Sequence, residues 1–576
     1  MRPSNNRHVV RSVSPFGRIA CFTAASQVVV MKTSSSGDTN NSTGVTVPSS
    51  WFVLTVTTIL VAASIRILLP ALQQLLLKPK TTSSRRQRDD AKVFGKPVLP
   101  NGRGLGLLER WFVANTRAGV HTGFIVAVEF TTTATHIRNM NMTNKDNVMD
   151  ALTRVSQRFP WLRTRLYHQN VEMQQQQQLW GDDLHVQVHD SADLVPFGFR
   201  QVVQMSLSEI LNEEMNSGWD DQDPTMPLWR VTMIHSSDGL EVTLVLAFHH
   251  LITDGIGAMA VVQALLEEGG TTTTDFKVAQ RNTLAPPLED LVDTVPRVRH
   301  LFMPVLLDRF PMLIPYLKPP CWKGMQLHHS DTAATTILDP IMKEMQMVCL
   351  NIVPFEELQQ LDQYCKTNKL STNAILMATL IKAIVKVEEN HTGLRFHIVT
   401  AADERRRRCH LPPSSALGNY ITAPHMTLQL PVSSTIDYMS SPNMARVYQS
   451  KLQHSLQTSL MDIGLTRFIV NDWVEFVKQS CRHSSSTLSN NITYSLESSN
   501  LGMQVFDPKA SANWKVTNIW FAQGRRGTGC AIEVKMVGGP QGYNACMSAF
   551  PCAVTKETLI KIGDAWRNEI DCLYIV

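Results

Sequence analysis

The sequence lacks any regular spacing of cysteine. Its ten cysteines are scattered over 576 residues, and no two of them form a Cys-x-x-Cys pair. A disulfide framework needs a more regular pattern, so we expect reduced, mostly buried thiols in a cytosolic setting. Strong charge of one sign is also missing, since the net charge is only +5. With neither zinc-finger spacing nor an RNA-recognition aromatic signature, nucleic-acid binding is not expected.

A long uninterrupted hydrophobic run is missing as well. The apolar stretch that begins at Trp51 runs for about fifteen residues before Arg66, short of the ~20 that span a bilayer. Apolar residues continue to Leu77, so residues 51–77 are expected to form a membrane-anchor helix that is tilted across the bilayer or lies in its interface. A soluble amphipathic helix is the alternative. Basic residues crowd the following segment, which by the positive-inside rule places the rest of the chain in the cytosol.

The segments on either side of this helix are polar. Residues 1–50 are basic at first, with no acidic residue before Asp38, and are expected to be disordered or to act in targeting. Met31 would serve equally well as the start of the chain. Residues 78–98 are predicted to be a polar linker. The sequence therefore predicts a protein anchored at the endoplasmic reticulum, or at another organelle if residues 1–30 are a transit peptide.

From residue 99 onward, apolar alternation and helical periodicity follow one another, which is typical of a mixed α/β fold. A proline-rich stretch over 286–335 divides this region. We expect two similar-sized α/β lobes, 99–285 and 336–576, joined by that crossover. Apolar residues at 301–317 would line either a lipid-facing surface or a buried crossover.

The most informative motif is Phe-His-His-Leu-Ile-Thr-Asp-Gly, residues 248–255. The apolar run 242–248 before it predicts a buried strand, the second arm of a hairpin over 228–248. The residues after it predict a helix that ends near 269–270. A histidine at the end of a buried strand is held rigidly and can face a cleft.

The residue types in this motif favour proton transfer. His250 has an unperturbed pKa near 6.5 and can take a proton at neutral pH. Asp254 follows four residues later, and Gly255 gives the backbone freedom for a turn that brings the carboxylate back to the site. The order of strand, His-His-x-x-x-Asp-Gly and helix therefore predicts a general base mounted at a strand end.

Two other interpretations of the histidine pair are polar filler at a strand end and a zinc site. No Cys/His cluster of ligand spacing accompanies the pair, so no metal is predicted. A second pair, His328-His329 with Asp331 nearby, lacks the preceding strand and the trailing glycine and helix. That pair is predicted to lie in a solvated loop.

Several short motifs keep the order and spacing of a known family. In chain order they are Leu107-Leu108-Glu109-Arg110, Phe159-Pro160-Trp161-Leu162-Arg163, Pro227-Leu228-Trp229-Arg230, Ser371-Thr372-Asn373-Ala374-Ile375-Leu376, Leu417-Gly418-Asn419-Tyr420 and Ser499-Asn500-Leu501-Gly502. With the His-His-x-x-x-Asp-Gly motif, they resemble the condensation-domain superfamily of acyltransferases, which has the fold of chloramphenicol acetyltransferase. The Asp-Phe-Gly-Trp-Gly motif of plant BAHD acyltransferases is absent, and the chain most resembles the alcohol acetyltransferase branch, which is also related to wax ester synthase/diacylglycerol acyltransferases.

The resemblance implies two lobes, each a mixed sheet flanked by helices, with the active-site channel between them. It implies that His250 is the catalytic base and that His249 is structural. Asp254 would pair with an arginine and shape the loop. Arg405 is the candidate partner, although four consecutive arginines, 405–408, leave the assignment open.

The resemblance also suggests groups that line the channel or stabilise the oxyanion. They are Asn500, the backbone N–H groups near Gly502, and Asn419. Acyl-CoA would be the co-substrate, with acetyl or another short acyl group transferred and no bound cofactor. Because the predicted anchor places the site beside a bilayer, the acceptor would be a small hydrophobic alcohol such as a sterol, terpenoid, carotenoid or fatty alcohol delivered from the membrane. The enzyme would be a monomer.

Three alternatives remain open. The first is an enzyme of the same fold that condenses carrier-bound groups, although no carrier or adenylation module accompanies the chain. The second is an enzyme that transfers long acyl chains, as wax ester synthase/diacylglycerol acyltransferases do. The third is a non-catalytic binding protein on the same scaffold, against which the intact His250, Asp254 and Gly255 argue.

Overall fold

The computed structural model divides the chain into two compact units, Met1–Leu77 and Lys78–Val576, and all the residues it describes lie in the second. The described residues are 102–120, 123–132, 145–168, 184–189, 198–203, 205–221, 223, 226–235, 241–269, 283–297, 300, 321–325, 344–388, 394–430, 441–470, 472–482, 492, 494–506, 514–524 and 529–574. The predicted anchor helix, the segments beside it, the apolar stretch at 301–317 and the second histidine pair lie outside them.

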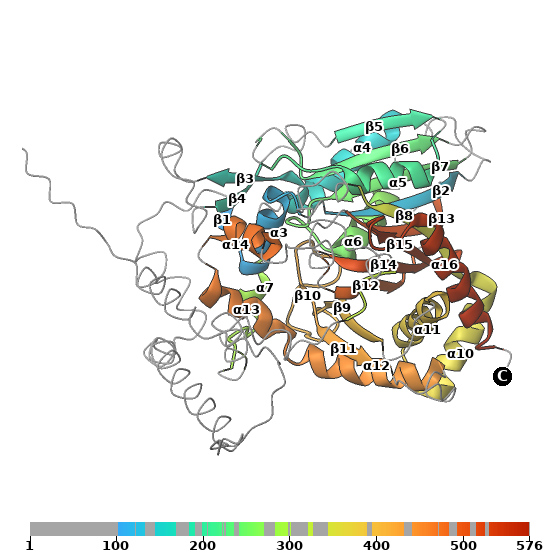
Figure 1. Cartoon of the computed structure of the whole chain (residues 1–576). Helices are drawn as coiled ribbons and strands as arrows, with labels where there is room; N and C mark the ends of the chain where they lie inside the picture. The colour runs from blue at the N-terminus through green and yellow to red at the C-terminus, as the bar shows by residue number, and fades with distance from the viewer. Residues whose placement is uncertain are drawn as a thin grey trace, which may run out of the picture. The chain divides into compact units, whose positions relative to one another are not determined.

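Five strands form a first mixed sheet, in the order β13-β2-β7-β6-β5 (Figure 1). Only β5 and β6 are parallel. The strands are β2 (Phe124–Thr132), β5 (Gly198–Val203), β6 (Trp229–His235), β7 (Glu241–Phe248) and β13 (Trp514–Gln523). The antiparallel β6–β7 pair confirms the arms of the predicted hairpin, whose turn residues lie outside the described chain.

Helices cover both faces of this sheet, which explains why β7 is apolar without alternation. On one face, α4 (Lys145–Arg158) and α6 (Gly255–Gly269) pack against Leu244, Leu246 and Phe248. On the other, α5 (Leu207–Asn216) packs against Val245 and Ala247. The predicted buried strand and the helix predicted after the motif are confirmed.

Seven strands form the second mixed sheet, in the order β10-β9-β12-β14-β15-β8, with β11 also paired to β9. The β9–β12 and β12–β14 pairs are parallel. The strands are β8 (Gln346–Pro354), β9 (Arg395–Asp403), β10 (Ile421–Thr422), β11 (His425–Gln429), β12 (Tyr494–Met503), β14 (Cys530–Gly539) and β15 (Gly542–Ala549). The predicted mixed α/β class is confirmed.

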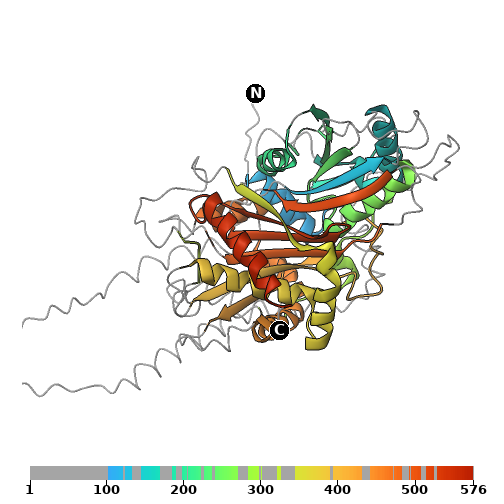
Figure 2. The same cartoon turned by 90° about the vertical axis from the view of Figure 1, so that its right-hand side faces the viewer.

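One face of the second sheet buries a helical layer (Figure 2). Its helices are α10 (Leu358–Asn368), α11 (Thr372–Val387), α12 (Ser441–Leu456) and α16 (Lys556–Asp571). Ser371 caps α11 by accepting a hydrogen bond from the Ala374 N–H at 3.2 Å. Trp566 of α16 donates to the Leu376 carbonyl at 3.1 Å, which fixes α16 against α11.

The strand β13 corrects the predicted division into lobes. It lies within 336–576, the range assigned to the second lobe, yet it pairs antiparallel with β2 along the edge of the first sheet (Figure 2). Ile519 and Phe521 enter the core of the first sheet. The second half of the chain therefore completes the first sheet, and β13 links the two cores.

The remaining elements lie around these two sheets. A small antiparallel sheet has the order β1-β4-β3. The elements are β1 (Gly102–Gly104), β3 (Thr164–His168), β4 (Leu184–Val188), α3 (Leu107–Arg117), α7 (Leu288–Leu291), α13 (Ser459–Ile469), α14 (Trp473–Arg482) and the short 3₁₀ helices η2 (Pro160–Arg163) and η7 (Phe355–Glu357). In the part of the chain that is described, no single helix has both the length and the apolar composition to cross a bilayer. Among the described helices, the bent pair Phe355–Asn368 and Thr372–Val387 has the required length and apolar composition when the two helices are taken together.

Candidate active site

The end of β7 places the two histidines of the motif in different surroundings. The His249 N–H donates to the Leu228 carbonyl at 2.9 Å, so the main chain at His249 is still paired with the segment that leads into β6. Its Nδ1 accepts a hydrogen bond from the Leu251 N–H at 2.9 Å, inside the turn. Burial, followed by the charge of His250, lowers the pKa of His249 to about 3. His249 is thus a neutral residue that shapes the turn, as the resemblance implies.

The His250 ring lies between two aromatic side chains. It stacks on Phe112 of α3, with ring centroids 4.1 Å apart and planes at 7°, and contacts Phe124 of β2 at 4.7 Å. Burial lowers the pKa of His250 to about 4, while the charge of Asp254 and the hydrogen bond with Asn419 act in the opposite direction. The imidazole is therefore neutral at pH 7, the state that a general base requires.

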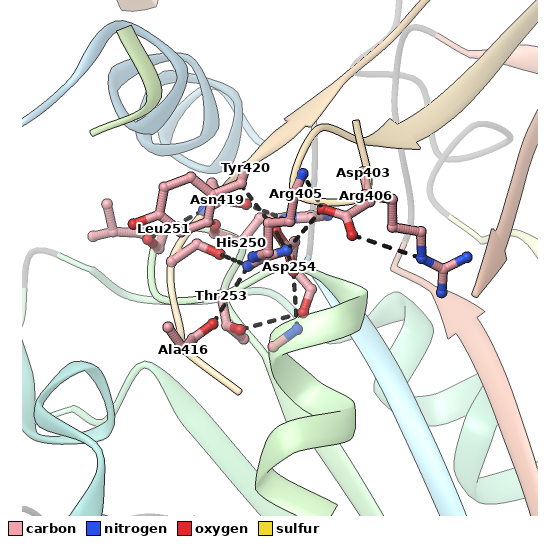
Figure 3. Close-up of polar contacts among 12 residues, drawn as sticks. His250, Leu251, Thr253, Asp254, Asp403, Arg405, Arg406, Ala416, Asn419 and Tyr420 are labelled. Carbon is pink, nitrogen blue, oxygen red and sulfur yellow. Dashed lines mark hydrogen bonds and ion pairs between the residues drawn. The ribbon is translucent and has the colours of Figure 1, made fainter. Parts of the chain in front are cut away.

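Asn419 determines which ring nitrogen of His250 carries the proton (Figure 3). The Asn419 amide nitrogen donates to the main-chain carbonyls of His250 and Leu251. Its oxygen Oδ1 therefore faces His250 Nδ1, at 3.3 Å, and accepts the proton of that nitrogen. The lone pair of the neutral ring is then on Nε2.

This position corrects the expectation that Asn419 lines the channel or holds an oxyanion. The residue is buried, and both ends of its amide are engaged with the His250 turn. Asn419 is a positioning residue for the imidazole, and its separation of 169 residues from His250 hid that role from the sequence.

Asp254 points away from the imidazole and into an ion pair with Arg405 (Figure 3). Its Oδ2 lies 2.9 Å from Arg405 Nη1, and the two side chains are 0% and 3% exposed. It also accepts hydrogen bonds from the N–H groups of Gly257 and Tyr420, each at 2.9 Å. The predicted pair is present, and Asp254 organises the loop through it.

The structure resolves which of the four arginines makes this pair. Arg407 and Arg408 bind Glu404, at 2.7 and 3.0 Å, and Arg406 lines the cavity described below. Arg405 alone among them reaches Asp254.

Arg405 also holds the loop that carries Asn419. Its Nη2 donates to the carbonyls of Ala416 and Gly418, at 3.4 and 3.3 Å, and its guanidinium lies 4.6 Å from the centre of the Tyr420 ring. Gly418 has φ +131°, a conformation that side chains disfavour. The Asp254–Arg405 pair thus positions Asn419, which in turn orients His250.

Gly255 is needed for a reason other than the predicted one. It is not among the glycines with positive φ. A Cβ placed on it would lie 2.6 Å from Cδ2 of Leu501, a residue of β12. The absence of a side chain therefore lets the second sheet approach the start of α6.

A cavity of about 700 Å³ opens at His250, within the range of small-molecule sites. Phe112 of α3 and Ile256 of α6 line one side, together with Phe521 of β13. Residues of β9, β10 and β12 line the other. Both sheets thus contribute to the wall around the imidazole.

Asn500 and Gly502 line this cavity, as expected, but they interact with each other. The Gly502 N–H donates to Asn500 Oδ1 at 2.8 Å, so this backbone donor is already engaged and does not match the predicted oxyanion donor. The Asn500 amide nitrogen lies 3.4 Å from Asn373 Oδ1, a weak contact.

Sequence reasoning missed the aromatic rings around His250 and a buried pair in the cavity wall, Glu497 and Lys535. Phe112 lies two residues after the Leu-Leu-Glu-Arg landmark, which is the only signal that could have indicated it. Glu497 and Lys535 lie on strands whose pairing no local pattern reveals.

Comparison with known proteins identifies the family of the segment that carries His250, Asp254 and Asn419. The family model described as alcohol acetyltransferase matches residues 200–559. A probable alcohol acetyltransferase of Aspergillus fumigatus, crmB, is 23% identical over 359 residues, which cover 59% of this chain and 71% of that protein.

Two solved structures resemble the fold. The TRI3 trichothecene 15-O-acetyltransferase from Fusarium sporotrichioides has a TM-score of 0.58 at 13% identity, covering 82% of this chain and 95% of its own. The condensation domain of the Monacolin K polyketide synthase MokA has a TM-score of 0.53 at 10% identity, covering 83% and 98%. At these identities the likeness shows the fold alone, which confirms the expected condensation-domain-like acyltransferase architecture.

Proposed function

The chain belongs to the alcohol acetyltransferase family, and from this premise we propose that it transfers an acetyl group from acetyl-CoA to the hydroxyl of a hydrophobic alcohol, with His250 as general base. The observation that carries the proposal is a neutral imidazole at the cavity wall whose Nδ1 proton is committed to Asn419. Nε2 is then the nitrogen that can accept a proton from an acceptor hydroxyl.

The reaction needs no covalent intermediate, because a thioester carbonyl is already electrophilic. The acceptor oxygen attacks that carbonyl while Nε2 of His250 takes its proton. The C–S bond then breaks, and the imidazolium returns the proton to the leaving thiolate of CoA. The charge of Asp254 and the hydrogen bond with Asn419 both favour the transient imidazolium.

The tetrahedral intermediate also requires a donor for its oxyanion. With the Gly502 N–H engaged, the amide nitrogen of Asn500 is the group we assign to this task. Its contact with Asn373 is weak, at 3.4 Å, so the amide can turn to a stronger acceptor.

Acetyl-CoA as donor is supported by the charge at one part of the cavity. Arg406 lines the cavity, its side chain is 58% exposed, and its Nη2 donates to the Leu501 carbonyl at 2.9 Å. An exposed guanidinium tethered beside Gly502 suits the phosphates of a CoA molecule. The hydrophobic character of the acceptor is supported by apolar lining residues, among them Trp111, Ile463 and Phe476.

Transfer of radiolabelled acetyl groups tests the proposal. The full chain is incubated with labelled acetyl-CoA and an extract of membrane alcohols, and esters are separated from unreacted donor. His250→Ala should lower the rate by about 10²–10⁴ while leaving the melting temperature close to that of the wild type.

His249→Ala is the matched control, since it removes a neighbouring imidazole that does not line the cavity. It should lower stability more than His250→Ala and activity less. Equal ester formation by the wild type and His250→Ala would exclude the proposed base. Labelled long-chain acyl-CoA in a parallel reaction separates acetyl transfer from transfer of long acyl chains.

A further inference from the structure

One helix in the cavity wall presents a polar face to the cavity. Ser459, Asp462 and Thr466 of α13 line the cavity, and their spacing of three and four residues places them on one side of the helix. The helix α13 packs against α3 (Figure 1), whose Phe112 stacks on His250. The polar face of α13 therefore lies next to the helix that covers the imidazole.

Asp462 is the ionisable residue on this face, and the protein supplies no cation for it. Its side chain is exposed and lines the cavity. It makes no ion pair and accepts no hydrogen bond from any residue that the structure describes. Surrounding protein atoms partly desolvate the carboxylate and raise its pKa to about 6, so it is largely ionised at pH 7.

The other two carboxylates in the described cavity wall already have cationic partners. Asp403 Oδ1 lies 3.1 Å from Arg405 Nη1, and Glu497 Oε1 lies 2.9 Å from Lys535 Nζ. Among the described lining residues, Asp462 is thus the acid whose charge the protein leaves uncompensated.

Aromatic rings line the cavity from the helices beside α13. Trp111 of α3 and Phe476 of α14 have ring centroids 6.4 Å apart and planes at 61°. Ile463 follows Asp462 on α13 and lines the cavity with them. Aromatic rings attract cations through their faces and also pack well against hydrocarbon. This part of the cavity therefore combines a negative charge with surfaces that accept an alkylated cation.

The combination selects the chemistry of a ligand group. An apolar ligand that displaced water from Asp462 would leave a desolvated charge without a partner, which is unfavourable. A ligand hydroxyl would donate one hydrogen bond and leave the charge uncompensated. An ammonium group would supply both a charge-assisted hydrogen bond and the opposite charge, while its alkyl substituents packed against the rings.

We propose that Asp462 binds a positively charged amine of the acceptor. The acceptor class is then an amino alcohol on an apolar skeleton, acetylated at its hydroxyl. The inference rests on the proposed function, because it concerns the alcohol that His250 deprotonates. A protonated tertiary amine has no lone pair, so it takes no part in the acetyl transfer.

The test compares alcohols of the same shape that differ in charge. The full chain is given acetyl-CoA with 4-(dimethylamino)-1-butanol, 6-(dimethylamino)-1-hexanol and 8-(dimethylamino)-1-octanol. The matching neutral alcohols, with CH in place of the protonated nitrogen, are 5-methyl-1-hexanol, 7-methyl-1-octanol and 9-methyl-1-decanol. At the best spacing, kcat/KM for the amino alcohol should exceed that for its neutral match by on the order of 10-fold. This is the lower end for a hydrogen bond between charged groups, because the exposed Asp462 is partly screened by water.

Asp462→Asn should remove this preference through a higher KM for the amino alcohol. The values of kcat/KM for the neutral alcohol and of KM for acetyl-CoA should stay nearly unchanged, as should the melting temperature. Asp462→Glu keeps the charge and should keep the preference. Asp564→Asn is the matched control, since it removes the same charge from an exposed position on α16, a helix that does not line the cavity. It should retain the preference.

Three outcomes would overturn the inference alone. They are a kcat/KM for the neutral alcohols equal to or above that for the amino alcohols in the wild type, a preference that survives in Asp462→Asn, and an equal loss of preference in Asp564→Asn, which would assign the effect to the net charge of the molecule. No acetylation of any of these alcohols would overturn the proposed function, and the inference with it.

Discussion

The proposed proton transfer by His250 depends on Asn419, a residue that does not line the cavity. Asn419 accepts from Nδ1 and donates to two carbonyls of the same turn, so its amide has a single orientation that satisfies all three contacts. Without this partner, the neutral imidazole can carry its proton on either nitrogen. Only the form with the proton on Nδ1 leaves Nε2 able to accept a proton from the alcohol.

Two substitutions of Asn419 separate positioning from catalysis. Asn419→Ala should lower kcat by about 10²-fold with little change in KM, because the base is misplaced and binding groups remain. Asn419→Asp places a carboxylate beside Nδ1 and should raise the pKa of His250, since a nearby opposite charge favours the imidazolium. The acidic limb of the profile of kcat/KM against pH should therefore move to higher pH. An unchanged profile in Asn419→Asp would show that residue 419 does not act through the imidazole.

The lowered pKa values of the two histidines predict how stability depends on pH. Burial lowers the pKa of His250 to about 4 and that of His249 to about 3, whereas both would titrate near 6.5 in the unfolded chain. Between these values the unfolded state binds more protons than the folded state, so the free energy of unfolding falls as pH decreases from 6.5 towards 4.

Melting temperature measured at intervals across this range should show the decline. The decline should be shallower in His250→Ala, which removes one of the two protonation sites. A slope identical to that of the wild type would mean that His250 is not held neutral by the fold.

At the scale of elements, the Asp254–Arg405 pair joins the start of α6 to the loop at 416–420. Asp254→Asn should lower both the melting temperature and the activity, because it leaves Arg405 with a buried and poorly compensated charge. Breaking such a pair costs about 3–5 kcal/mol. Activity falls because the loop that carries Asn419 is released.

The comparison with Asn419→Ala distinguishes the two roles. That variant should lose activity with a smaller fall in stability than Asp254→Asn, because it removes hydrogen bonds but leaves no buried charge unpaired. Thermal melting alongside acetyl transfer measures both. Asp254→Asn with wild-type stability and no activity would instead indicate that Asp254 takes part directly in the reaction.

Local patterns predicted the elements that carry the motif and failed where distant segments meet. The apolar run of β7 and the start of α6 after the motif both depend on neighbours within a few residues, and both elements were predicted. The pairing of β13 with β2 joins residues almost 400 positions apart, and no periodicity encodes a partner. The same reason hid the role of Asn419, which lies 169 residues from His250. It also hid the Glu497–Lys535 pair, which depends on the pairing of β12 with β14 inside the second sheet.

Gly255 shows a further limit of sequence reasoning. The residue was predicted to matter, but as a turn glycine with unusual backbone angles. Its role depends on Leu501, from the other sheet, which approaches the position where a Cβ would stand. A glycine in a motif indicates a steric requirement, and only the fold shows whether that requirement is backbone conformation or space.

At the scale of the whole molecule, every residue assigned to the site belongs to the compact unit Lys78–Val576. The cavity walls, the His250 turn and the loop that carries Asn419 are built from described residues beyond position 101. The groups assigned to the proposed catalysis therefore all lie outside residues 1–77, for which the sequence predicts targeting and membrane anchoring.

Removal of residues 1–77 tests this division of labour. The truncated chain should retain kcat for a short, water-soluble alcohol within a few-fold of the full chain, because the cavity and its two sheets are intact. It should also move from the membrane pellet to the supernatant after centrifugation, since the predicted anchor is gone. For an alcohol supplied in vesicles the truncated chain should be slower, because the anchor would otherwise keep the cavity beside the bilayer.

A truncated chain that stays in the pellet would show that a second surface binds lipid, and the apolar stretch at 301–317 would then be the segment to substitute. Loss of activity on the water-soluble alcohol as well would mean that residues 1–77 contribute to the fold of the site itself.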